Sequence, residues 1–306
     1  MSQIRRVVRS WKSVPTIEGA GVHLKRALGF QGSSPELDPF LLLDDFHSHS
    51  PAKYLPGFPW HPHRGIETIT YVLEGKVAHG DSMGNSGIIG IGDVQWMTAG
   101  SGIIHQEMPE GETDGRLWGL QLWTNLPSSH KMMSPCYREI KAQDIPEAVL
   151  NSGARVKVIC GTVDGIRGPV QDVIAEPEYL DITMLPHSSL LHGVKDGHTA
   201  IAYVIAGSAR FDEKSGQLSD AANERTSRRG QRELRGISHG PESVILFERE
   251  GDEIAVSAED DGARFVLVTG QPIGEPVAWS GPIVMNTQEE LRTAFQEYRE
   301  GTFVKK

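Results

Sequence analysis

The chain has 306 residues, of which 23% are charged and 38% are hydrophobic, a balance typical of soluble globular proteins and not of disordered ones. Its formal net charge of −10 predicts repulsion from phosphate backbones and anionic lipid, so we expect neither direct nucleic-acid binding nor membrane binding. Because no apolar run reaches the length of a signal peptide or a membrane span, we expect a cytoplasmic protein. Cys136 and Cys160 are the only cysteines, and we expect both to be free thiols.

Short apolar, β-branched runs bounded by glycine turns dominate the first half of the chain. Turn signals such as Gly92-Asp93 separate them. Short strands at this regular spacing are typical of a sandwich or a small antiparallel barrel. The predicted strands cover residues 65–73, 88–91, 94–98 and 117–124.

A second set of strands is predicted after Pro146. The motif YVLEG at residues 71–75 resembles YVIAG at residues 203–207, and a Gly-Asp step follows each of them. This repeated order favours a duplicated barrel. We therefore predict an all-β protein with one domain at residues 1–140 and a second at residues 141–306. The strands of the second set cover residues 156–160, 179–185, 200–205, 244–247, 253–256 and 264–269.

Two segments depart from this pattern. Residues 212–243 are polar and lack apolar periodicity, which predicts a long mobile loop whose role the sequence does not define. Residues 288–300 carry apolar side chains at helical spacing after a capping residue, Asn286 or Thr287. We expect a short terminal helix that packs on the second barrel.

Two pairs of residues with i, i+2 spacing indicate a metal site. His61 and His63 form the first pair, and His105 and Glu107 form the second. Side chains two residues apart in a strand share one face, with Cα atoms about 6.5 Å apart. Imidazole and carboxylate ligands suit iron, nickel, copper, manganese or zinc. A single His-x-His is commonly a turn or surface feature, but two pairs flanking short strands favour one shared site.

A second carboxylate competes for the role of fourth ligand. Glu67 lies four residues after His63, so strand alternation would place it on the same face as the histidines. Spacing alone does not choose between Glu67 and Glu107.

Other residues receive more modest predictions. An apolar wall of the metal pocket and ordinary core packing are both open for Phe58, Trp60, Trp96 and Met97, with core packing expected for at least half of them. We expect Arg64 to form a structural salt bridge, with Asp44 or Asp45 as candidate partners. His187, His192 and His198 are not spaced as a ligand pair, so we expect them to lie in loops or at the surface.

Long stretches of the chain resemble the pirin family of the cupin superfamily. The similarity is carried by DPFLLLDDFHSHSPAKYLPGFPWHPHRGIETITYVLEGKVAHGDSMGNSG at residues 38–87 and by GDVQWMTAGSGIIHQEMP at residues 92–109. GEPVAWSGPIVMNTQEEL at residues 274–291 extends it to the far end. The 212–243 segment is the clearest departure from the family.

This resemblance implies a bicupin, two cupin β-barrels in tandem, with one divalent metal in the N-terminal barrel and no metal in the C-terminal one. The metal is iron in most members, with nickel, copper, manganese, cobalt and zinc as alternatives. The family's ligand positions correspond to His61, His63, His105 and Glu107. The resemblance thus favours Glu107 as the carboxylate ligand and leaves Glu67 a structural or supporting role.

Pirins also resemble quercetin 2,3-dioxygenases, which implies a flavonol-type aromatic substrate. Four protein ligands on a six-coordinate ion leave two positions for chemistry. Glu107, or a hydroxide on the metal, would take the proton of the flavonol 3-hydroxyl. The alternative is a redox-responsive regulatory protein that binds a protein partner without physiological turnover. A closed tetrahedral zinc site with a purely structural role is a third reading.

Overall fold

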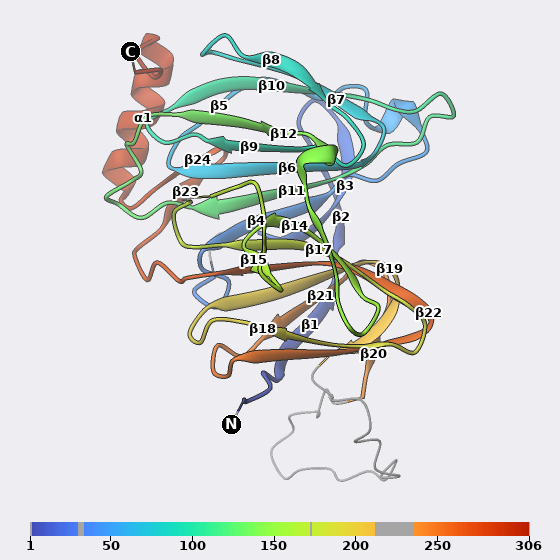
Figure 1. Ribbon diagram of the computed structural model, residues 1–306. Helices are drawn as coiled ribbons and strands as arrows, with labels where there is room; N and C mark the ends of the chain where they lie inside the picture. The colour runs from blue at the N-terminus through green and yellow to red at the C-terminus, as the bar shows by residue number, and fades with distance from the viewer. Residues whose placement is uncertain (1, 30–33, 172, 212–235, 306) are drawn as a thin grey trace. The chain divides into compact units, whose positions relative to one another are not determined.

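The computed structural model describes residues 2–29, 34–171, 173–211 and 236–305. The predicted all-β class with one short C-terminal helix is confirmed. The chain divides into two compact units (Figure 1). We call residues 13–145 with 272–306 the N-barrel unit, and residues 1–12 with 146–271 the C-barrel unit.

Two antiparallel sheets form most of the N-barrel unit. The larger has the spatial order β12 (Cys136–Ile140), β9 (Val94–Thr98), β6 (Ile66–Glu74), β11 (Trp118–Asn125), β4 (Phe40–Asp45), β3 (Val22–Leu28) and β2 (Val14–Glu18). The smaller has the order β5 (Phe58–His63), β10 (Ile103–Glu110), β7 (Lys76–Asp81) and β8 (Ser86–Ile89). The unit also contains the 3₁₀ turns η1 (Pro51–Lys53) and η2 (Ala142–Asp144). Strand β6 is buried from Ile66 to Leu73, because both of its faces are covered.

The C-barrel unit consists of one branched sheet around an apolar core. Its main path runs β1 (Val7–Lys12), β21 (Ser243–Phe247), β19 (Thr199–Phe211), β22 (Glu253–Gly270), β17 (Glu178–Met184), β14 (Arg155–Cys160) and β13 (Glu147–Val149). Strand β18 (Ser189–Gly193) pairs with β22, and β20 (Ser238–His239) pairs with β19. A separate hairpin joins β15 (Thr162–Val163) and β16 (Ile166–Arg167). Strand β22 is continuous across residues 253–270, so the two strands predicted there are one.

Each unit is built from two separate stretches of chain. Residues 1–12 belong to the C-barrel unit, and residues 272–306 belong to the N-barrel unit. Strand β1 pairs with β21 of the C-barrel unit. The C-terminal segment, residues 272–306, belongs to the N-barrel unit and carries β23 (Ala278–Ser280), β24 (Ile283–Met285) and α1 (Gln288–Glu300). The expected packing of the helix on the second barrel is therefore wrong. Helical spacing predicts an apolar face but does not identify the surface that covers it.

Thr287 caps the start of helix α1 with a capping box in which Thr287 and Glu290 satisfy each other's backbone amides. It ends at Gly301, which has a φ of 72°. The buried Arg64 fixes this end, since its Nη2 donates to Glu297 at 2.7 Å and to the carbonyl of Phe303 at 2.9 Å. The predicted structural salt bridge of Arg64 thus exists, but its partner is not Asp44 or Asp45.

A buried lysine ties the same segment to the barrel. The Lys131 ammonium donates to the carbonyl of Gly65 at 2.9 Å, to Asn125 Oδ1 at 2.7 Å and to the carbonyl of Val284 at 3.0 Å. Three acceptors match its three N–H donors. Gly65 has a φ of 78°, and a Cβ there would lie 1.9 Å from the Val284 oxygen, so only glycine permits this close approach.

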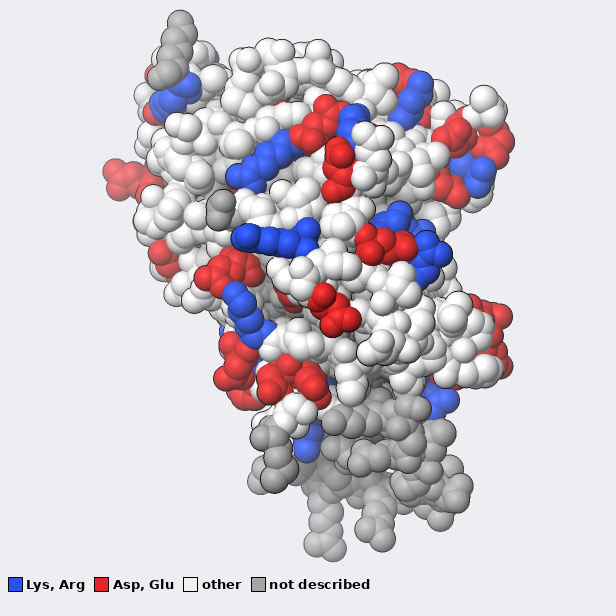
Figure 2. All heavy atoms as spheres, viewed as in Figure 1, with Lys and Arg blue, Asp and Glu red and all other residues white. Residues whose placement is uncertain are grey.

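Other features of the described residues bear on the sequence predictions. Of the predicted loop at 212–243, residues 212–235 lie outside the described residues, whereas 238–239 form β20 and 243 begins β21. Neither Cys136 nor Cys160 forms a disulfide within the described part of the chain. No described helix is long and apolar enough to cross a membrane. On the face shown in Figure 2, charged side chains of both signs are interspersed.

We predict that Lys131→Met lowers the free energy of unfolding of the N-barrel unit by about 2–5 kcal/mol, because it removes the buried ammonium that donates to three acceptors. Lys53→Met, at an exposed lysine, should change it by less than about 0.5 kcal/mol. Urea titration followed by tryptophan fluorescence measures both values. Equal stability of the two variants would contradict this role of Lys131.

Candidate metal centre

Three histidines converge in the N-barrel unit. His61 and His63 lie two residues apart on β5, so their side chains share a face. Strand β10 pairs with β5 so that His105 lies directly opposite His61. One ring nitrogen of each histidine lies within 4.8 Å of those of the other two. The register of two neighbouring strands thus assembles the three residues that the sequence singled out.

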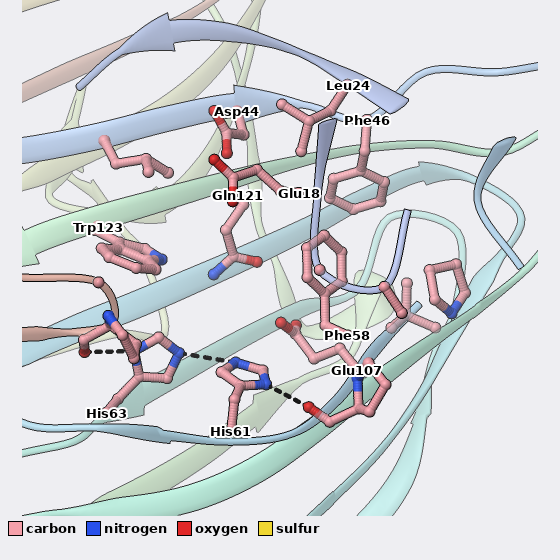
Figure 3. Close-up of a pocket in the computed structure, with 18 of the residues that line it drawn as sticks. Glu18, Leu24, Asp44, Phe46, Phe58, His61, His63, Glu107, Gln121 and Trp123 are labelled. Atoms are coloured by element: carbon pink, nitrogen blue, oxygen red, sulfur yellow. Dashed lines mark hydrogen bonds between the residues drawn. The ribbon is translucent and has the colours of Figure 1, made fainter. Parts of the chain in front are cut away.

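Backbone carbonyls fix the orientation of two of these rings (Figure 3). Nδ1 of His61 lies 2.8 Å from the carbonyl of Pro59, and Nδ1 of His63 lies 3.1 Å from the carbonyl of Pro282. A carbonyl only accepts, so each Nδ1 carries the proton and each neutral ring keeps its lone pair on Nε2. The segment that supplies Pro282 is the C-terminal one, far away in sequence.

The resulting arrangement fits a metal ion. Nε2 of His61 and Nε2 of His63 face each other at 3.0 Å, so two lone pairs are opposed unless a cation or a proton lies between them. Ligand atoms about 2.1 Å from one ion and at right angles to each other lie about 3.0 Å apart. His105 Nε2 is buried and has no hydrogen-bond partner among the described residues. Unsatisfied buried nitrogens of this kind are expected at a ligand site.

Burial also keeps the imidazoles neutral. Desolvation lowers the pKa of His61, and it lowers the pKa values of His63 and His105 well below their usual range. Neighbouring histidines lower the latter two further. Neutral imidazole is the form that binds a metal ion. Near neutral pH, therefore, no proton has to leave these rings when a metal ion binds.

Glu107 lies next to this group but is not a member of it. Its strand, β10, has a register irregularity between His105 and Glu107, opposite β5. The Glu107 carboxylate is buried, and the hydroxyl of Thr70 lies 2.8 Å from its Oε1. Burial raises the pKa of Glu107 to about 7, against the opposing effect of the Thr70 hydrogen bond. The hydrogen bond from Thr70 engages one carboxylate oxygen of Glu107, so the lone pairs of the other oxygen remain available to a ligand.

Glu67 does not face the histidines. The chain turns at Gly65 between β5 and β6, so strand alternation does not carry over from His63 to Glu67. Thr98 Oγ1 donates to Glu67 at 2.6 Å. On the regular strand β6, Glu67 points to the face opposite that of Thr70. The expected shared face is therefore wrong, and the structure assigns Glu67 no place beside the three imidazoles.

A cavity of about 660 Å³ opens from the histidines. Its walls are mostly apolar, and this volume is ordinary for a site that binds a small organic molecule. Phe58 and Trp60 line it, whereas Trp96 and Met97 are buried and do not. At least half of the four aromatic and methionine candidates are thus core residues, as predicted. The remaining walls include Leu24, Leu42, Phe46, Val77, Trp123 and Trp279.

Several site residues are not evident from sequence patterns. Thr70 and Gln121 belong to no local motif, and only the pairing of β6 with β11 brings them together, so that Thr70 Oγ1 lies 2.7 Å from Gln121 Oε1 and 2.8 Å from Glu107 Oε1. Pro282 acts through its backbone carbonyl, which no side-chain motif reveals. In the C-barrel unit, His187 is exposed in a turn and His198 lies in a connection between strands, as expected, although His198 is buried. His192 departs from the expectation, because it is buried on β18 with its Nε2 3.3 Å from Glu178. No metal-ligand group among the described residues includes these histidines.

The two strand-rich units define a bicupin, and the group of three histidines is a candidate metal site in one of its barrels. Residues 21–124 match the family model for pirin, and residues 179–304 match the model for the pirin C-terminal cupin domain. The chain belongs to the pirin family.

Relatives cover almost the whole chain. A pirin-like protein of Caulobacter vibrioides is 39% identical, over 98% of this chain and 99% of its own length. Pirin-like protein 2 of Arabidopsis thaliana is 42% identical, over 93% of this chain and 81% of its own. The crystal structure of quercetin 2,3-dioxygenase from Acinetobacter baumannii superposes with a TM-score of 0.83 and 30% identity, over 98% of this chain and 99% of that one.

We predict that alanine at His61, His63 or His105 reduces metal loading from about one ion per chain to near zero, because removal of one ligand leaves two imidazoles with poorer orientation. Glu67→Gln should load like the wild type, since Glu67 faces away from the site. Elemental analysis of the purified variants gives the stoichiometry. Loss of metal from Glu67→Gln, with retention by His105→Ala, would show that the ligand set is different.

Proposed function

We propose that the protein is a metal-dependent dioxygenase that acts on quercetin or a related flavonol. One divalent transition metal, iron by family resemblance, would be held by His61, His63, His105 and Glu107. The observation that carries the proposal is the convergence of three imidazoles, two of them buried, beside an apolar cavity large enough for a flavonol. The similarity to a quercetin 2,3-dioxygenase over nearly the whole chain supports the same reaction class.

A bound ion of this type would supply Lewis-acid and redox chemistry. The residues of the chain supply the remaining requirements. The apolar walls exclude water from the reacting part of the substrate, and Trp123 and Phe58 offer flat surfaces to an aromatic ring. Glu107 would hold the proton taken from the substrate hydroxyl.

The large cavity beside the histidines also bears on the two alternative roles, a structural zinc site and a regulatory protein. A closed tetrahedral zinc site with a structural role would not need a cavity of this size beside it. A regulatory role is favoured by one observation, the hydrogen bond between His63 and the carbonyl of Pro282. Through it, a change at the metal would reach the C-terminal segment and its helix, on which a partner protein could act. The same site would then serve as a sensor without turnover.

We predict that metal affinity rises about tenfold per pH unit up to pH 7 and is nearly constant above it. The raised pKa of Glu107 means that the free site holds a proton below pH 7, and this proton must leave when the carboxylate binds the ion. The histidines do not contribute in this range because their pKa values are lowered. Competition with a chelator between pH 6 and 8 measures the slope.

Glu107→Gln is the control for this effect, since it keeps the size of the side chain and removes its titration. It should bind metal more weakly at pH 8 and show no slope between pH 6 and 7. A slope that persists in Glu107→Gln would exclude Glu107 as its origin.

The test of the proposed activity is quercetin oxidation by protein loaded with one metal at a time under nitrogen and then exposed to air. We predict loss of the flavonol absorbance with release of carbon monoxide for at least one metal, and loss of more than about 99% of this activity in Glu107→Gln. Glu67→Gln should retain most of it. Full metal occupancy without conversion under any metal would contradict the dioxygenase and favour the regulatory role.

A further inference from the structure

A row of polar side chains crosses one wall of the cavity. Arg26 on β3 lies opposite Asp44 on β4, Asp44 lies opposite Gln121 on β11, and Gln121 lies opposite Thr70 on β6. Directly paired residues of neighbouring strands share a face of the sheet. The row therefore runs from Thr70, which contacts Glu107, to the part of the wall that is remote from the histidines.

At the remote end of the row, Arg26 and Asp44 form a charged group together with Glu18 of β2. Nε and Nη2 of Arg26 donate to the two oxygens of Asp44 at 2.9 and 2.8 Å, and Nη1 lies 2.8 Å from Glu18. Figure 3 shows Glu18 and Asp44 together, with Gln121 between them and the histidines. All four residues line the cavity. Polar and charged side chains thus interrupt the apolar wall beyond Gln121, on the side away from the histidines.

The balance of charge in this group selects what it can bind. One guanidinium faces two carboxylates, and its donors are directed at those carboxylates. The carboxylates keep lone pairs that Arg26 does not use, so the group as a whole is an acceptor of hydrogen bonds with an excess negative charge. A hydroxyl group of a ligand satisfies such a surface, whereas a ligand carboxylate meets like charge.

A structural ion pair accounts for only part of this arrangement. Asp44 is buried, and its bidentate pairing with Arg26 would stabilise the adjoining strands in any case. Glu18 differs, because its side chain is 41% exposed, at the end of the edge strand β2. A solvated carboxylate there adds little to stability. Its place in the cavity lining is better explained by contact with a ligand.

We propose that Glu18, Asp44 and Arg26 form a specificity subsite that accepts hydroxyl donors at the end of an aromatic substrate remote from the metal and disfavours a carboxylate there. This subsite rests on the proposed flavonol-binding function of the same cavity. It favours flavonols with a hydroxylated pendant ring over those whose pendant ring is bare or acidic.

The test uses isothermal titration calorimetry on metal-loaded protein under nitrogen, where no turnover occurs. The ligands are quercetin, galangin, which lacks pendant-ring hydroxyls, and a flavonol with a carboxylate on that ring. The wild type should bind quercetin about tenfold more tightly than galangin, the value of one hydrogen bond to a charged acceptor. It should bind the carboxylated flavonol more weakly than galangin.

Glu18→Gln removes the exposed charge and keeps an acceptor of similar shape. The preference for quercetin should fall to about threefold, since a neutral acceptor forms roughly half as strong a bond. Binding of the carboxylated flavonol should improve, a gain that a damaged fold would not produce. Glu147→Gln is the matched control, because Glu147 also pairs with an arginine but lies in the C-barrel unit.

The subsite and the proposed function can fail separately. Equal affinities for quercetin and galangin, or a preference that Glu18→Gln leaves unchanged, would overturn the subsite even if quercetin is oxidised in air. The predicted preferences in binding, without oxidation of either flavonol, would support the subsite and contradict the dioxygenase.

Discussion

The close approach of imidazole lone pairs determines what the site can bind. Two carbonyls hold protons on Nδ1 of His61 and His63, so the two Nε2 atoms that face each other at 3.0 Å both carry lone pairs. The buried Nε2 of His105 lies nearby without a hydrogen-bond partner among the described residues. Such an arrangement is unfavourable for an empty polar pocket and favourable for a ligand set that is already oriented. The neutral state imposed by burial points in the same direction. Metal binding would therefore remove an unfavourable repulsion between lone pairs that the fold imposes on the metal-free site.

The C-terminal segment is part of this construction. Lys131 and Arg64 attach it to the barrel through buried polar contacts, and the carbonyl of Pro282 then orients His63. This segment belongs to the N-barrel unit and β1 belongs to the C-barrel unit, so neither barrel is encoded by one continuous stretch of chain. This explains how a residue more than two hundred positions away in sequence takes part in the metal site. It also gives the site a physical link to helix α1.

Sequence reasoning predicted the class of the fold, the boundaries of α1 and the three histidines, because these depend on local periodicity and spacing. It did not predict what depends on register or on distant segments. The turn at Gly65 reverses the face expected for Glu67, and the partner of Arg64 comes from the far end of the chain. The polar row through Gln121 has no local signal, since each member lies on a different strand. Family resemblance favoured Glu107, and the structure places its carboxylate beside Thr70, next to the histidine group.

Binding of one metal ion by the three converging imidazoles can be observed in a crystal structure of metal-loaded protein, with anomalous diffraction recorded at the absorption edge of that metal. We expect a single strong peak about 2.0–2.2 Å from the Nε2 atoms of His61, His63 and His105, with none in the C-barrel unit. A fully loaded crystal whose peak lies away from these nitrogens, or beside His192, would contradict it.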